Sequence, residues 1–426
     1  VQENQAQAAL ARELRRKAEL QAALQDQAAA KTIARRTVLG AFGVSGMGVL
    51  VGYTILRSDK EKRDLNERLI ADLKDFWKQG ERDSALGKNP GAPEETSEVR
   101  GGTGSDDGQG VPTWAIGAVG ADRSPYTGKG CVVAIVGTGV EASHPAFRGA
   151  TLIQKDFTGT GNGDQNGHDT HNAGTIFGRP VEGRRFGVAP GVTLVLVAKV
   201  IGGRGYAPQE AIWSGLNWVM NHPSMPDVVC VALSLNPVEN IGNLLQLNKP
   251  DAASVAVAHA LREYAGLLKT VQSFSAVSAS VGKGSVIVMP AGNESQEKAR
   301  RPVTSPMSLP QGVISVGAVQ EGANGYKVPY FSNSLPTLTA PGFDLPSAHL
   351  QGKIRSHSGT SMACACAAGV AALWWEYLRS KRPPAEVTSR MVATEMLKAV
   401  RSDIFAPDVQ ESERGAGLIQ SPFATR

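Results

Sequence analysis

Five largely apolar runs, separated by helical stretches, limit the folds open to this chain more than any other feature of its sequence. A parallel strand that is covered on both faces has such a run instead of an alternating pattern. The segments 209–221 and 251–268 have helical character. This alternation predicts an α/β fold with a doubly wound, mostly parallel sheet and helices on both faces. The apolar runs are 131–136, 193–200, 228–235, 285–289 and 313–319.

Charge and cysteine content exclude some classes of function. The net charge of +5 is modest for 426 residues, and basic residues are mixed with acidic ones throughout. Because no basic stripe results, we expect no nucleic-acid partner. The cysteines lack the spacing of metal ligands, and we expect them to be buried free thiols rather than disulfides. They are Cys131, Cys230, Cys364 and Cys366.

The N-terminal quarter of the chain differs in composition from the rest. Residues 1–36 are rich in Ala, Gln, Glu and Arg and predict a polar helix. Residues 37–56 carry no charge and are long enough to cross a bilayer, so they predict a transmembrane helix. An amphipathic stalk over 57–88 and a flexible Gly/Pro/Ser-rich linker over 89–110 follow. We therefore expect a single-pass membrane protein with one folded domain, 111–426.

The sidedness of the membrane segment stays open. Arg35 and Arg36 resemble a twin-arginine export signal, which slightly favours an extracytoplasmic domain, and no small-x-small cleavage site follows, so we expect an uncleaved anchor. Lys and Arg within fifteen residues number three before the segment and five after it, which favours the opposite orientation. The alternative is a glycine-rich helix that packs on a partner protein, so helix-mediated association through 1–36 or 37–56 is a further expectation.

Three short motifs carry the residue types that amide hydrolysis needs, namely a nucleophile, a base and a donor to the developing oxyanion. Ser361, in Gly-Thr-Ser-Met-Ala before a run of small residues, is the candidate nucleophile. His168, in Gly-His-Asp-Thr-His-Asn-Ala-Gly, is the candidate base. Asn293, which ends Pro-Ala-Gly-Asn, is the candidate oxyanion donor. We expect all three motifs to lie at the carboxyl ends of the strands, where active sites of such sheets lie.

The order and content of these motifs resemble the subtilisin-like serine peptidases (peptidase family S8). The resemblance runs from Val111 to Pro422, and further matching segments are 126–130, 187–190, 331–333, 340–342 and 415–419. It implies a subtilisin-like fold and a serine endopeptidase that takes a peptide or protein substrate. It implies no cofactor; structural calcium is common in the family, but no acidic loop here matches a ligand pattern. The implied substrate-binding residues are Ser234, Leu235, Asn236, Ala291 and Gly292.

One residue of the family pattern is missing. Where the family has the aspartate that orients the histidine, this chain has Gly137, in Ile-Val-Gly-Thr-Gly. That aspartate holds the imidazole tautomer and stabilises the imidazolium, and glycine can do neither. We therefore expect a protease that is impaired or depends on a partner. The alternative is an inactive, membrane-tethered pseudoprotease that binds peptides or serves as a scaffold.

A second departure lies beside the histidine. The family has His-Gly-Thr-His, whereas this chain has Asp169 in the glycine's place. Asp169 is a candidate surrogate for the missing carboxylate. The alternative is a first-turn acid that interacts with the helix dipole and faces away, since adjacent helix residues seldom share a face. Asn236 and Ala365 also depart from the family pattern and favour altered activity.

Overall fold

The computed structural model describes the peptidase-like part of the chain. Its described residues are 110–202, 209–233, 271, 283–295, 304–305, 308 and 310–423. The predictions for the N-terminal helix, the membrane segment, the stalk, almost all of the linker and the helix over 251–268 lie outside these residues.

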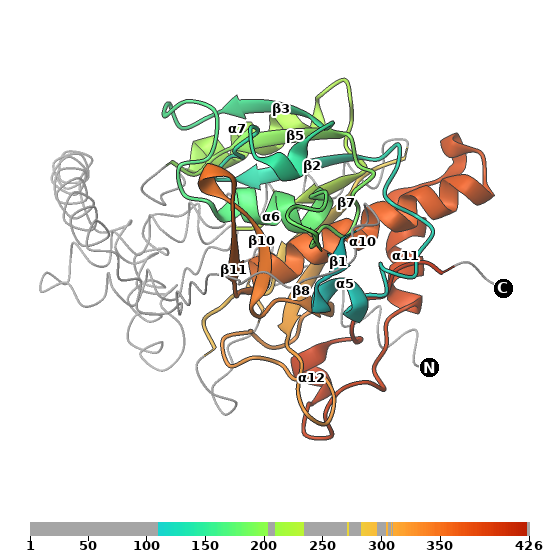
Figure 1. Cartoon of the computed structure of the whole chain (residues 1–426). Helices are drawn as coiled ribbons and strands as arrows, with labels where there is room; N and C mark the ends of the chain where they lie inside the picture. The colour runs from blue at the N-terminus through green and yellow to red at the C-terminus, as the bar shows by residue number, and fades with distance from the viewer. Residues whose placement is uncertain are drawn as a thin grey trace, which may run out of the picture. The chain divides into compact units, whose positions relative to one another are not determined.

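A seven-stranded sheet forms the centre of this part (Figure 1). Every neighbouring pair of its strands is parallel, which confirms the predicted α/β fold. The apolar run 228–235 contributes only a short strand, which ends at Cys230. In spatial order the strands are β3 (Thr151–Asp156), β5 (Leu194–Lys199), β2 (Val132–Gly137), β6 (Val228–Cys230), β7 (Val286–Pro290), β8 (Val313–Val319) and β9 (Leu338–Pro341).

The remaining elements cover or flank the sheet. The main helices are α6 (His168–Phe177), α7 (Gln209–Met220), α10 (Thr360–Lys381) and α11 (Ser389–Lys398). An antiparallel hairpin, β10 (Leu345–His349) with β11 (Lys353–His357), packs against α6. The short elements are β1 (Val111–Pro112), which pairs with β4 (Arg184–Arg185), α5 (Trp114–Ala118), α12 (Glu411–Arg414), and the single turns η1 (Pro145–Phe147), η4 (Leu350–Gly352) and η5 (Pro384–Glu386).

The largely apolar runs are explained by burial of the sheet on both faces. Successive side chains of a strand point to opposite faces. In β2, Val133 and Ile135 belong to one core cluster together with residues of α6 and α10. Ala134 and Val136 belong to a second cluster, which contains the apolar side of α7. Gly137 follows the same alternation, so a side chain at that position would point toward α6.

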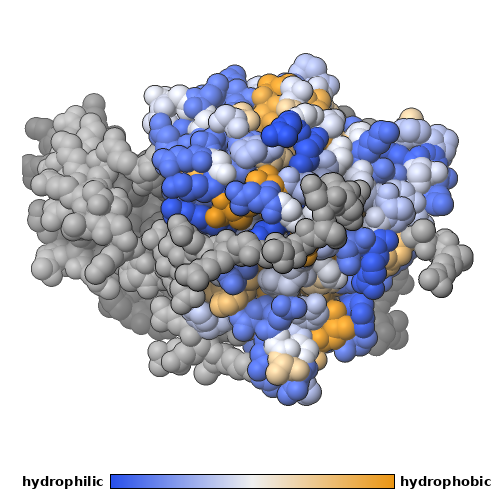
Figure 2. Space-filling model, viewed as in Figure 1, coloured by the Kyte–Doolittle hydropathy of each residue, from blue (hydrophilic) through white to orange (hydrophobic). Residues whose placement is uncertain are grey.

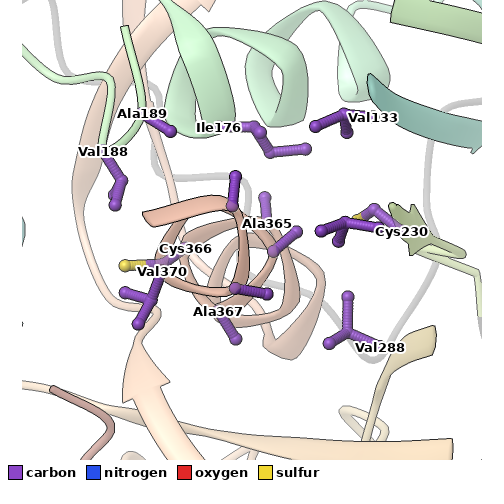
Figure 3. Close-up of a cluster of buried hydrophobic side chains, with 14 of the residues drawn as sticks. Val133, Ile176, Val188, Ala189, Cys230, Val288, Ala365, Cys366, Ala367 and Val370 are labelled. Carbon is purple, nitrogen blue, oxygen red and sulfur yellow. The ribbon is translucent and has the colours of Figure 1, made fainter. Parts of the chain in front are cut away.

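Helix α10 lies in the middle of the larger cluster, with strand residues on one side and α6 on another (Figure 3). Small residues line the helix, and a Cβ added to Gly369 would lie 2.6 Å from Cβ of Val188. Such close approach requires a small residue. Among the residues that the structure describes, α10 alone is long and apolar enough to cross a membrane, but 83% of its apolar stretch is buried, as in a core helix.

The four cysteines are buried and free, as expected. Sγ atoms of Cys230 and Cys364 lie 3.7 Å apart, one on β6 and one on α10. Hydrophilic residues cover most of the described surface on the face in Figure 2, where the apolar areas are small and separate.

Candidate active site

Asn293 lies beside the first turn of α10, which carries Ser361, and His168 begins α6, a helix that packs against α10. Asn293 comes three residues after the end of β7, and Ser361 lies in the first turn of α10. The Ser361 hydroxyl donates a 3.2 Å hydrogen bond to the carbonyl of Ala232, two residues after β6 ends. These strand ends lie at the edge of the sheet at which we expected the site from the sequence.

The imidazole of His168 has a carboxylate behind it. Its Nδ1 lies 2.8 Å from Oδ1 of Asp169. Because a carboxylate only accepts hydrogen bonds, Nδ1 carries the proton and donates it. This tautomer leaves Nε2 unprotonated, as a general base requires. Asp169 is a first-turn acid of α6, as the alternative had it, but its carboxylate is buried and bonded to His168, so it does not face away.

The space for that carboxylate exists because residue 137 is glycine. A Cβ built on Gly137 would lie 2.8 Å from Cγ of Asp169 and closer still to Oδ2. Oδ2 also accepts a 2.7 Å hydrogen bond from the backbone amide of Thr138, and the Thr138 hydroxyl accepts one from the Asp169 amide at 3.1 Å. The carboxylate of Asp169, on the helix, thus occupies the space that a side chain at position 137, on the strand, would fill.

The charges around His168 favour its protonated form. Burial acts to lower the pKa of His168, but the hydrogen bond and charge of Asp169, together with the charge of Asp164, outweigh it and raise the pKa above its ordinary value. The neighbouring histidines differ. Burial, with the charges of nearby groups, lowers the pKa of His357 to about 4 and that of His171 well below its usual range. Of these three histidines, His168 is therefore the one that we expect to take up a proton near neutral pH.

The amide of Asn293 is fixed at its oxygen end. Its Oδ1 accepts hydrogen bonds of 2.8 Å from both the backbone amide and the hydroxyl of Thr360. The Thr360 hydroxyl in turn accepts a bond from the amide of Gly292, at 3.1 Å. With Oδ1 held, the NH₂ group remains for a ligand. The backbone amide of Ser361, in the first helical turn, has no carbonyl one turn earlier to donate to. These two donors have the character of an oxyanion hole.

The remaining predicted site residues fall into two groups. Ser234, Leu235 and Asn236 lie outside the described residues. Ala291 and Gly292 directly follow β7, and Gly292 has a φ of 106°, a conformation that favours glycine. In the described part of the chain, no group of three or more His, Cys, Asp or Glu residues could hold a metal ion.

Sequence reasoning missed Asn172. Its Nδ2 lies 3.0 Å from Asp169 Oδ1 and 3.2 Å from His168 Nδ1. The signal was available, because residues three and four apart on a helix share a face. It was passed over because an asparagine in a helix carries no catalytic motif of its own.

Known proteins match the same part of the chain. The model of the subtilase family (Peptidase S8) matches residues 128–417. A subtilisin-like protease 1 of Trichophyton equinum is 31% identical over 276 residues, which cover 62% of this chain and 46% of that protein. A cuticle-degrading serine protease of Arthrobotrys oligospora is 28% identical over 311 residues, covering 68% of this chain and 65% of that protein. The chain thus spans between about half and two thirds of these relatives.

A solved structure, of a cold adapted subtilisin-like serine proteinase, is 26% identical with a TM-score of 0.49, covering 70% of this chain and 91% of that one. The family model extends over well more than half of the 426 residues and includes all three motif residues. This chain belongs to the subtilase family, peptidase family S8.

Proposed function

We propose that the chain is a serine endopeptidase whose triad is Ser361, His168 and Asp169, with the carboxylate supplied from the helix instead of the strand. The observation that carries this proposal is the 2.8 Å hydrogen bond between His168 Nδ1 and Asp169 Oδ1, in a space left free by Gly137. The substrate is a peptide or protein, in keeping with the family.

The mechanism follows from the roles of these atoms. His168 Nε2 takes the proton of the Ser361 hydroxyl as Oγ attacks the carbonyl carbon of the scissile bond. Asn293 Nδ2 and the Ser361 amide donate to the oxyanion of the tetrahedral intermediate. His168 then returns the proton to the leaving amine, and an acyl-enzyme remains for water to hydrolyse. The Asp169 carboxylate stabilises the imidazolium.

The Ser361 hydroxyl donates to the Ala232 carbonyl. For attack it must rotate toward His168. Catalytic hydrogen bonds are often long or misaligned before substrate binds, and they tighten in the Michaelis complex.

This proposal revises the expectation of impairment. That expectation depended on the absence of any carboxylate behind the imidazole, and the hydrogen bond between the buried Asp169 and His168 supports the revision. Membrane attachment through 37–56 remains a prediction that does not bear on the chemistry.

Labelling with a fluorophosphonate, followed by hydrolysis of a chromogenic peptide amide, tests the proposal. We expect Ser361 to be labelled, and both Ser361→Ala and His168→Ala to abolish labelling. Asp169→Asn should lower kcat by about 10⁴-fold, as loss of a triad aspartate does in other serine proteases. An unlabelled, correctly folded protein would instead favour the pseudoprotease. Wild-type kcat in Asp169→Asn would refute the assignment of the carboxylate.

A further inference from the structure

We infer that Asn172 is a positioning residue of this active site: its side-chain NH₂ holds the Asp169 carboxylate in place behind His168. The inference rests on the proposed function, because it assigns a role within the same triad. It accounts for how a carboxylate on the residue next to the base can act on that base.

The geometry places Asn172 against both partners at once. It lies three residues after Asp169 and four after His168 in α6, so the three side chains share one turn. Nδ2 of Asn172 donates to Oδ1 of Asp169 at 3.0 Å. Oδ1 thus receives hydrogen bonds from the imidazole and the amide, while Oδ2 receives the backbone amide of Thr138. A carboxylate held at both oxygens cannot rotate away from the ring.

The orientation of the Asn172 amide is determined by chemistry. Turning the amide over would bring its oxygen against the carboxylate oxygen of Asp169, and two acceptors repel each other. In the orientation observed, Oδ1 of Asn172 is buried and has no hydrogen-bond partner in the described structure. A buried oxygen without a partner lowers stability, so an apolar side chain of similar shape would favour folding more. The NH₂ group bonds Asp169 although the oxygen of the same amide is buried without a partner, which points to a role for the NH₂ group in the site.

The proximity of Asn172 to the imidazole makes its effect depend on Asp169. Nδ2 lies 3.2 Å from His168 Nδ1. While Asp169 is present, Nδ1 is protonated and donates to the carboxylate. Without Asp169, the amide can donate to an unprotonated Nδ1 and stabilise the tautomer that is protonated on Nε2. That tautomer cannot accept the proton of Ser361, so Asn172 should support activity in one background and oppose it in the other.

The test is a cycle of variants read out by kcat, KM and the ¹⁵N shifts of the His168 ring. Asn172→Leu preserves the branched shape and removes the donor. We expect kcat to fall about 10- to 100-fold, the range typical of lost outer-shell support. KM should stay unchanged, and the ring should lose part of its Nδ1-protonated population. In the Asp169→Ala background, the same substitution should raise kcat instead.

Thr175→Val is the matched control, because Thr175 is also buried in α6 and donates only to the carbonyl of His171. It should leave kcat and the ring tautomer unchanged. If Asn172→Leu folds poorly, Asn172→Ala and titration of the active sites with fluorophosphonate correct kcat for the folded fraction. Wild-type kcat in Asn172→Leu, or an equal loss in both backgrounds, overturns the inference. Full activity in Asp169→Asn would refute the proposed triad itself. Full activity in Asn172→Leu alone would refute only the role of Asn172, so the two failures can be told apart.

Discussion

The exchange of a glycine and an aspartate between positions 137 and 169 makes a quantitative prediction. In Gly137→Asp, the new Cβ would lie 2.8 Å from Asp169 Cγ, whereas non-bonded carbons need about 3.5 Å or more. Asp169 would therefore have to retreat by about 0.7 Å or more, and its 2.8 Å bond to His168 would stretch to the limit of a hydrogen bond. Two carboxylates in one buried space would also repel each other. We expect kcat to fall about 10³-fold, which is about 4 kcal/mol of transition-state stabilisation.

The assay is a double-mutant cycle on peptide amide hydrolysis, with thermal unfolding measured on each variant. Gly137→Asp and Asp169→Gly should each be strongly impaired. The double variant, which returns the carboxylate to the strand, should exceed either single variant by at least about tenfold, because contacting residues are not additive. Gly117→Ala is the matched control, since nothing lies within 4 Å of a Cβ there. A Gly137→Asp variant that is more active than the parent would refute the reasoning and support the pseudoprotease.

Three further predictions concern charge and burial. Because the pKa of His168 is raised above its usual 6.5 and the base must be neutral, kcat/KM should fall as the pH drops through a midpoint above 6.5; a midpoint below 6.5 in a pH profile would contradict this. Asp227→Ala should lower the free energy of unfolding by about 3–5 kcal/mol, because it leaves Arg379, which donates to both oxygens of this buried carboxylate, without its partner. Denaturant unfolding measures the loss, and a loss under about 1 kcal/mol would argue against a stabilising role of this ion pair. Burial raises the pKa of the Cys366 thiol to about 12, so a thiol reagent at pH 8 should modify it only after denaturation; rapid labelling of the native protein would show that α10 opens.

Much of the architecture could be predicted because it depends on patterns that are local in the sequence. Apolar runs such as 313–319 became strands with nearly the predicted bounds, since burial on both faces requires continuous hydrophobicity. The motifs around His168, Asn293 and Ser361 lie at strand or helix ends, where the sequence placed them. The run 228–235 was predicted too long, because an apolar run does not show where pairing with neighbouring strands stops.

The sequence by itself determined the class of the fold, the family and the three candidate catalytic side chains, because each of these depends on short stretches of contiguous residues. Only the tertiary structure decided where the carboxylate of Asp169 lies. Its direction depends on an empty space at Gly137, which belongs to a different element, and on donors from Thr138 and Asn172. The space beside Gly137 forms only where the strand packs against the helix, so neither segment's sequence shows it. The position of the carboxylate that replaces the missing aspartate therefore required the tertiary structure.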